Sequence, residues 1–229
     1  MGLYLGKDKI SALRTIEKTT ASMKAYLEAG GKCRESDAVS FDGCWQASDW
    51  KNVTDCSYMF NNCQKLTSVP ALNTSNATNM NYMFYYCSKL TSVPEMDTSN
   101  VTDMRNTFER CESLTSIPLL DTSKVTNMYS MFYYCSKLKS IPALDVSNAT
   151  SLDYMFNYCP NLEAIHMHGM KVSFRIDHST KFTREALVEI LNNLATVTTS
   201  PTLTIGLTNL AKLTDADKAI ATGKGWKLE

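Results

Sequence analysis

Residues 78–101, TNMNYMFYYCSKLTSVPEMDTSNV, form a unit of 24 residues that recurs through the middle of the chain. Its phenylalanine, cysteine and leucine each return at the same interval without an insertion. These positions are Phe60, Phe84, Phe108, Phe132 and Phe156; Cys63, Cys87, Cys111, Cys135 and Cys159; and Leu66, Leu90, Leu114, Leu138 and Leu162. A fixed period in the twenties is typical of stacked coils that bury their apolar faces against one another. The sequence therefore predicts a solenoid of 24-residue coils.

Spacing within one coil predicts a short helix followed by a short strand. Ala77, Met80, Phe84 and Cys87 are three, four and three positions apart, which places them on one helix face. We expect a serine N-cap to begin each helix and a proline to end each strand, since a mid-strand proline removes a ladder hydrogen bond. The serines are Ser75, Ser99, Ser123 and Ser147, and the prolines are Pro70, Pro94, Pro118 and Pro142.

One helix and one short parallel strand per coil is the leucine-rich-repeat plan, so the predicted fold class is an α/β repeat. The flanking segments lack the repeat and are expected to cap the stack, because the end coils of a solenoid need a polar outer face. The predicted division is an N-terminal helical cap over residues 1–40, the solenoid over 41–168, and a C-terminal α/β cap over 169–229. In the last segment we expect a helix over 183–194, a strand over 202–205 and a capping box at Thr214 and Asp217.

The charge balance and the apolar runs exclude several classes of partner. Basic and acidic residues both number 23, and residues 53–168 hold seven basic and ten acidic side chains. No basic stripe is present for a nucleic acid. No apolar run approaches the roughly 18 residues of a membrane span, so no membrane insertion is expected. The first ten residues carry charges where an export signal would be apolar, which leaves a removed signal, another export route and an intracellular location all open.

The repeated cysteines are expected to be buried and reduced, because one thiol per coil at equal spacing is the pattern of a core position. Disulfides between neighbouring coils are the alternative that this spacing also permits. Either arrangement leaves the thiols on the face away from solvent, so no cysteine nucleophile is expected.

Catalytic and metal-binding signals are weak. His166 and His168 fall one period after Pro142 and Leu144, where the ladder ends, and the third histidine is His178. Two neighbouring histidines with one nearby thiol, Cys159, are a poor metal signal. No phosphate-binding loop, serine nucleophile elbow or zinc-protease sequence occurs. The sequence therefore predicts no enzyme, no cofactor and no metal site.

Tyrosine is the residue type that points to a surface function. Nine of the eleven tyrosines lie in the repeats, many at positions that face away from the phenylalanine and cysteine columns. Exposed aromatic rings are favoured in contact surfaces, although each ring could instead pack along the next coil. The candidate binding stripe consists of Tyr58, Tyr82, Tyr86, Arg110, Tyr134, Tyr154 and Tyr158.

The motif Met-Phe-x-x-Cys-x-x-Leu, followed by Leu-Asp-Thr-Ser-Asn-Val-Thr-x-Met, resembles the BspA-like leucine-rich-repeat proteins of bacterial surfaces. The resemblance covers about residues 53–165 and implies an adhesin-like module that binds a protein or a surface glycan. Residues 207–226 are similar to C-terminal segments of repeat proteins from gut bacteria and their phages. That similarity implies an alternative, a structural or receptor-binding component of a phage tail or surface appendage. A cell-surface, extracellular or virion location follows from the resemblance alone, and the sequence leaves the oligomeric state open.

Overall fold

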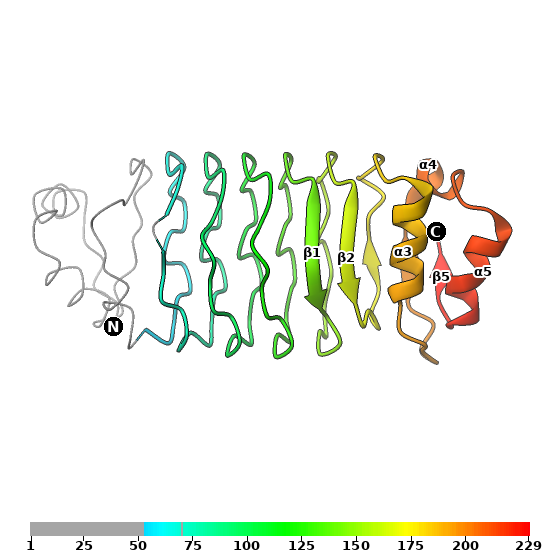
Figure 1. Ribbon diagram of the computed structural model, residues 1–229, viewed down its shortest axis with the longest axis horizontal. Coiled ribbons are helices and arrows are strands. Elements are labelled where there is room, and N and C mark those ends of the chain that lie inside the picture. Colours follow the sequence, from blue (N-terminus) through cyan, green and yellow to red (C-terminus); the bar gives the residue numbers. More distant parts are fainter. Residues whose placement is uncertain (1–52, 70) are drawn as a thin grey trace, which may run out of the picture.

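A computed structural model describes residues 53–69 and 71–229 of the protein. Figure 1 shows similar coils of the chain lying side by side along the long axis, with helices gathered at the C-terminal end. The described chain is therefore a repeat fold. The predicted N-terminal cap over 1–40 and the first part of the predicted 41–168 segment lie outside the described residues.

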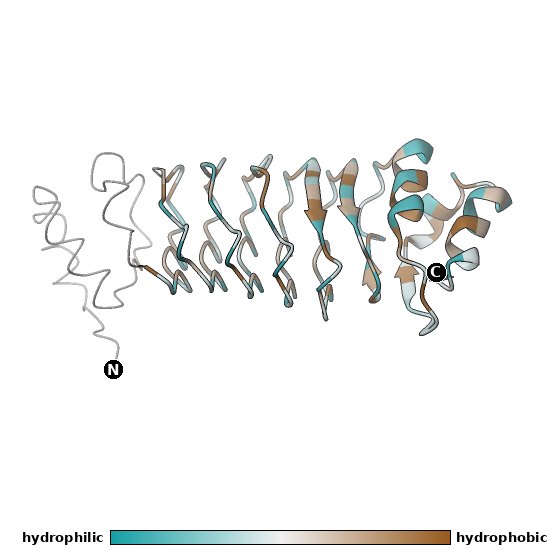
Figure 2. Ribbon diagram, turned by 60° about the horizontal axis from the view of Figure 1, so that its bottom comes forward, coloured by the Kyte–Doolittle hydropathy of each residue, from teal (hydrophilic) through white to brown (hydrophobic). Residues whose placement is uncertain are grey.

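Short parallel pairings connect neighbouring coils. Isolated parallel bridges join Asp55 to Asn79, Asn79 to Asp103, Asp103 to Asn127, and Asn127 to Ser151, each pair being 24 positions apart. On the other side of the coils, strand β1 (Ser140–Asp145) pairs in parallel with β2 (Ala164–His168). Figure 2 shows hydrophobic and hydrophilic segments alternating along the coils, as expected when each coil presents one side to the core and the other to solvent.

The predicted helix in each coil was wrong. Within the described residues, the first helix begins at Arg184, and residues 81–86 form consecutive turns instead. The amides of Met80, Tyr82, Phe84 and Tyr86 donate to carbonyls of the next coil, at 2.8–3.0 Å. Of the intervening amides, those of Met83 and Tyr85 donate to the carbonyl three residues earlier in the same coil, and that of Asn81 donates to Asn79 Oδ1. Alternate amides are thus committed between coils, which leaves no continuous i to i−4 ladder for a helix.

The predicted serine N-caps were also wrong, because there is no helix for them to cap. Ser99 instead closes a turn on the preceding aspartate: its backbone amide and its hydroxyl both donate to Asp97 Oδ1, at 3.0 and 2.6 Å. Ser123 and Asp121 repeat this arrangement one coil later. These are the Asx turns that aspartate forms with its own backbone two residues on.

Pro142 contradicts the expectation that proline ends each strand, since it lies inside β1. The register between β1 and β2 shifts between Ile141 and Leu144, and this irregularity accommodates the missing amide hydrogen. The shift also places Met167 opposite Leu144 and His168 opposite Asp145. The alignment of His168 with Leu144 from the 24-residue step was therefore wrong by one residue.

The core is a set of columns that run along the stack. Neighbouring phenylalanine rings from Phe60 to Phe156 are stacked with centroids 5.2–6.1 Å apart, and all five are fully buried. The described cysteines are buried and carry no disulfide, which confirms the reduced core cysteines. Each thiol from Cys87 to Cys159 donates to the carbonyl of a phenylalanine in the preceding coil, at 3.0–3.1 Å. The thiol is thus a buried donor between coils as well as a small apolar side chain.

The C-terminal segment builds a three-stranded parallel sheet and three helices. The sheet order is β3 (Phe174–Arg175), β4 (Thr202–Thr204) and β5 (Lys227–Leu228). The helices are α3 (Arg184–Asn193), α4 (Gly206–Leu210) and α5 (Asp215–Gly223). The helix and strand expected near 183–194 and 202–205 are both present. The capping box of Thr214 and Asp217 is confirmed.

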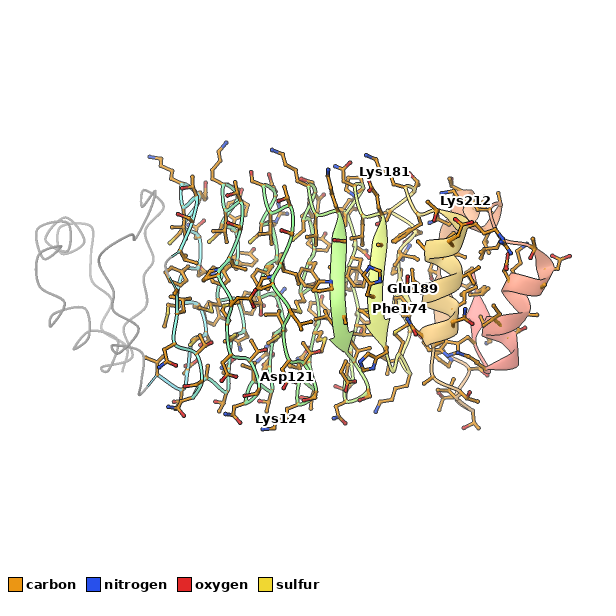
Figure 3. The ribbon with its side chains drawn as sticks, in the orientation of Figure 1. Asp121, Lys124, Phe174, Lys181, Glu189 and Lys212 are labelled. Carbon is orange, nitrogen blue, oxygen red and sulfur yellow. The ribbon has the colours of Figure 1, made fainter. Side chains whose placement is uncertain are left out.

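Helix α3 lies beside β2, where a further coil would place its strand (Figure 1). His166 on β2 and Glu189 on α3 bond at 2.6 Å across this junction. Figure 3 shows Lys181 on one long edge of the stack and Asp121 with Lys124 on the opposite edge. No helix in the described part of the chain has the length and apolar character to cross a membrane.

Candidate aromatic binding face

Two positions in every coil adopt a left-handed backbone. Ten residues have φ between +53° and +64°, and none is glycine. They form two columns, each with one residue per coil. The first column is Tyr58, Tyr82, Asn106, Ser130 and Tyr154, and the second column is Asn62, Tyr86, Arg110, Tyr134 and Tyr158. All seven candidate site residues from the sequence stand in these two columns.

Left-handed backbone at a residue with a Cβ costs about 1–2 kcal/mol, and glycine or asparagine tolerates it best. Asparagine occupies the position at Asn62 and Asn106, so the coil geometry accepts it. Tyrosine or arginine nevertheless fills seven of the ten positions. Side-chain contacts of these residues must therefore offset the backbone cost, either within the molecule or with a partner.

The second column is continuous from Tyr86 to the C-terminal segment. The Arg110 guanidinium lies 5.6 Å from the Tyr86 ring centroid and 4.7 Å from that of Tyr134. Tyr134 and Tyr158 stack at 4.3 Å with 20° between their planes. Tyr158 in turn meets the His178 ring at 4.5 Å. Rings and guanidinium thus cover one another's faces along the column.

The first column is interrupted in the middle. Tyr58 and Tyr82 stack at 4.7 Å, whereas the next two positions are the buried Asn106 and Ser130. Tyr154, which is 47% exposed, continues the column and meets Tyr129 edge-on at 5.6 Å. The expected stripe is therefore partly exposed and partly packed between coils, so both alternatives for the rings hold in part.

The sequence missed three tyrosines that belong to this face. Tyr85 contacts Tyr82 and Tyr86, and Tyr133 contacts the rings of Tyr134 and Tyr158. Tyr129, 39% exposed, lies against Tyr154 as described above. The signal was available for Tyr85 and Tyr133, which hold the same position of the repeat two periods apart. We define the aromatic face as the two columns together with Tyr85, Tyr129 and Tyr133.

The third coil differs from its neighbours on this face. Asn106, Glu109 and Arg110 stand where the second coil has Tyr82, Tyr85 and Tyr86. The Asn106 amide donates to Glu109 Oε2, and the Glu109 side chain is half-buried. Burial raises the pKa of the Glu109 carboxyl, although the Asn106 hydrogen bond opposes the shift. A polar gap therefore separates two groups of tyrosines.

The chemistry elsewhere in the described chain is structural. Burial raises the pKa of the Cys159 thiol to about 12, so this thiol is held in its unreactive form. His166 and His168 lie at the β2 edge, with acidic neighbours Glu189 and Asp145 at 2.6 and 3.8 Å. Over residues 53–69 and 71–229, no group of three His, Cys, Asp or Glu side chains is placed to hold a metal ion.

Comparisons with known proteins agree with the repeat fold. A family described as "Mycoplasma protein of unknown function, DUF285" matches residues 36–116 and 54–168, together more than half of the chain. A T. pallidum leucine-rich repeat protein of known crystal structure has a TM-score of 0.54 and 17% identity, over 77% of this chain and 79% of that chain. At that identity the similarity concerns the fold alone. A comparison with curated proteins gives no match.

Proposed function

The chain belongs to the family described as "Mycoplasma protein of unknown function, DUF285", and on that premise we propose a non-enzymatic recognition module that binds a protein through its aromatic face. The module is a leucine-rich-repeat-like solenoid of 24-residue coils, capped at both ends, with 169–229 as the C-terminal cap. The resemblance to BspA-like proteins supports an adhesin-like role at a cell surface or on a virion.

The observation that carries this proposal is the choice of tyrosine and arginine at strained backbone positions. Asparagine would meet the same backbone at lower cost, yet it fills two of the ten positions. Tyrosine and arginine are the residues most enriched at the centres of protein interfaces, where rigid side chains lose little entropy on binding. A rigid row of such side chains is what a docking face requires.

Ring stacking favours a protein over a glycan. A sugar ring packs on an uncovered aromatic face, whereas Tyr134 and Tyr158 cover each other at 4.3 Å, and Tyr58 and Tyr82 at 4.7 Å. Where two rings cover each other in this way, ring edges and hydroxyl groups are what remains for a partner. Edges and hydroxyls suit the mixed apolar and hydrogen-bonding contacts of a protein interface.

The same face separates the module from the alternative, a spacer or tip of a phage tail or surface appendage. A spacer depends on the buried phenylalanine and cysteine columns and not on outward tyrosines. Replacement of surface tyrosines would leave the structural role of a spacer intact but would abolish partner binding by a recognition module.

A non-enzymatic role is supported by where reactive groups lie. The six described cysteines are all buried. A hollow of about 450 Å³ beside Lys171 and Val197 is lined otherwise by Val172 and threonines, without a histidine, thiol or carboxylate. Neither location offers a nucleophile paired with a base.

The test compares binding by the protein and by a variant of its aromatic face. The variant combines Tyr86→Asn, Tyr134→Asn and Tyr158→Asn. We expect it to keep the fold, since asparagine suits left-handed backbone. We expect it not to bind a surface-protein partner that the wild-type chain binds. The matched control carries Thr91→Asn and Thr115→Asn, at exposed positions that are not members of this face. Equal capture by all three proteins, each folded by circular dichroism, would contradict the proposal.

A further inference from the structure

Arg110 differs from the other arginines of the described chain. Arg105, Arg175 and Arg184 each pair with an aspartate, at 3.1, 2.5 and 2.6 Å. Within residues 53–69 and 71–229, the Arg110 guanidinium makes ring contacts but neither an ion pair nor a hydrogen bond. A half-buried arginine without a carboxylate is unusual, because desolvating a charge is unfavourable unless something else stabilises it.

The two tyrosine rings supply part of that stabilisation and also fix the orientation of the guanidinium. Tyr86 and Tyr134 lie on opposite sides of it in the second column, at 5.6 and 4.7 Å. These cation–π contacts engage the positive charge but use none of the N–H groups of the guanidinium, which remain for other partners. The backbone at Arg110 is fixed as well, since its amide donates to Tyr133 O at 2.7 Å.

The neighbouring carboxylate does not fill this role. Glu109 precedes Arg110 in sequence, and the Arg110 charge lowers the pKa of its carboxyl, but this carboxylate accepts a hydrogen bond from Asn106 and forms no ion pair with the guanidinium. The two residues of the second column that contact Arg110 are both tyrosines. Arg110 is thus a preoriented planar donor fork whose natural complement is a carboxylate, which it can bind with two parallel hydrogen bonds.

We propose that Arg110 is the anchor of the aromatic face and binds the carboxylate of an aspartate or glutamate side chain of the protein partner. This inference rests on the proposed function and adds the chemistry of the partner to it. An acidic protein side chain is favoured over an acidic sugar because the flanking ring faces are already covered by the guanidinium and by Tyr158. The rings of Tyr86 and Tyr134, on either side, would help to exclude bulk water from the bound pair.

The repeat itself supplies the decisive variant. Arg110→Tyr gives the third coil the residue that the second, fourth and fifth coils carry at this position, so the column of rings continues and the fold is kept. The variant removes the cation and its N–H donors and replaces them by a ring that the column already accepts. Arg110→Lys keeps the charge but not the planar fork, and Arg105→Gln removes one positive charge from the same coil at an arginine already paired with Asp103.

The experiment selects binders from a displayed library of random 12-residue peptides against the wild-type chain. We expect the selected peptides to share an aspartate or glutamate at one position. Arg110→Tyr should weaken the binding of such a peptide at least about tenfold, as for a charge-assisted pair. We expect Arg110→Lys to give a smaller loss and Arg105→Gln to stay within about twofold of the wild type. Substituting the shared acid by its amide should weaken wild-type binding and leave the Arg110→Tyr affinity unchanged.

Two outcomes would overturn the inference while leaving the proposed function in place: selected peptides without a shared acid, or acid-dependent binding that Arg110→Tyr retains. Binding of 3′-sialyllactose that requires Arg110, without any acidic peptide binder, would also overturn it and assign the site to a sugar carboxylate. Failure to select any peptide whose binding depends on the aromatic face would count against the proposed function itself.

Discussion

At the scale of single residues, the cysteine column shows how one side chain serves two needs. Its thiol fills a fully buried core position, and it donates to a carbonyl of the preceding coil, as Cys111 does to Phe84 at 3.1 Å. Burial raises the pKa of the Cys111 and Cys135 thiols well above the usual value. These thiols are therefore protected both by enclosure and by their protonation state.

Protection of this kind predicts the pattern of chemical labelling. With iodoacetamide at pH 8, we expect Cys56, Cys63, Cys87, Cys111, Cys135 and Cys159 to remain unmodified in the folded chain and to react after unfolding in urea. Peptide mass spectrometry measures labelling at each cysteine separately. Cys33 and Cys44, which lie outside the described residues, are therefore distinguished from the other six. Rapid native labelling at Cys111 would show that the column is open to solvent.

The left-handed positions make a second prediction, on stability. Tyr134→Ala and Tyr134→Gly both lose the stacking on Tyr158 and on Arg110, about 1–2 kcal/mol in all. Glycine relieves the positive φ that alanine keeps, so we expect the glycine variant to be more stable than the alanine variant by about 1 kcal/mol. Urea unfolding measures the difference.

Thr126 provides the control, because it is exposed and its backbone is not left-handed. There we expect the opposite order, with Thr126→Gly less stable than Thr126→Ala. The same order at both positions would mean that the backbone at Tyr134 is not strained in solution.

Sequence reasoning succeeded at this scale where a residue type is tied to burial and failed where it is tied to backbone geometry. The periodic Phe84 and Cys87 identified the core, whereas the binding role of the outward tyrosines stays a prediction. The sequence did not indicate the left-handed backbone, because tyrosine is not a residue type that usually adopts it. The sequence also could not predict that Arg110 lacks an ion-pair partner, since this depends on which side chains the coils bring together.

At the scale of elements, the coil shows why a 3-4-3 spacing of apolar residues was misleading. Ala77, Met80, Phe84 and Cys87 are all buried, as a helix face would be, yet every second amide in this segment bonds to the next coil. Apolar spacing reports which side chains are buried and not where the amides bond. In the C-terminal segment no such competition exists, and the helix near 184–193 and the capping box were predicted correctly.

Helices α3 and α5 are joined by an ion pair that predicts a pH dependence. Arg184 donates from Nε and Nη2 to Asp217, at 2.8 and 2.6 Å, and the Thr214 amide adds a third bond. Arg184, more than the Thr214 amide, holds the pKa of the Asp217 carboxyl below its ordinary value. A depressed pKa in the folded state stabilises the fold above the unfolded value, about 4, and this stabilisation is lost as the pH falls through the folded value.

We therefore expect Arg184→Gln to lower the free energy of unfolding more at pH 7 than at pH 3, as measured by urea unfolding. Lys218→Gln, at an exposed partner of Asp215 on the same helix, should have a small effect at both values. An Arg184→Gln effect of equal size at pH 7 and pH 3 would mean that the ion pair contributes nothing in solution.

At the scale of the whole molecule, the proposed solenoid has one requirement, that every coil present the same two faces to its neighbours. The bridges from Asp55 to Ser151 and the phenylalanine stack from Phe60 to Phe156 advance by 24 residues at each coil. The third coil keeps the phenylalanine, cysteine and leucine columns of the core, with the buried Thr107 in place of a methionine, while it departs more widely on the aromatic face. Stability and the proposed recognition thus depend on different positions of the same repeat.

Removal of the third coil tests this division directly. Deleting residues 101–124 joins Asn100 to Val125, which takes the place of Val101, and should bring Phe84 onto Phe132. We expect a folded, cooperatively melting protein of lower stability, because each coil contacts its neighbours alone. Since Arg110 leaves with the deleted coil, the shortened chain should no longer prefer acidic peptides.

Deleting residues 101–123 is the matched control, because it leaves one extra residue at the join, so the core and surface positions on the two sides of the join are out of step by one. We expect this chain to lose the cooperative melt and to expose its thiols to labelling. Circular dichroism and the iodoacetamide assay compare the two deletions. If both fold equally well, the interval of 24 residues does not set the geometry of the stack; if the 24-residue deletion folds and still selects acidic peptides, the carboxylate site lies outside the third coil.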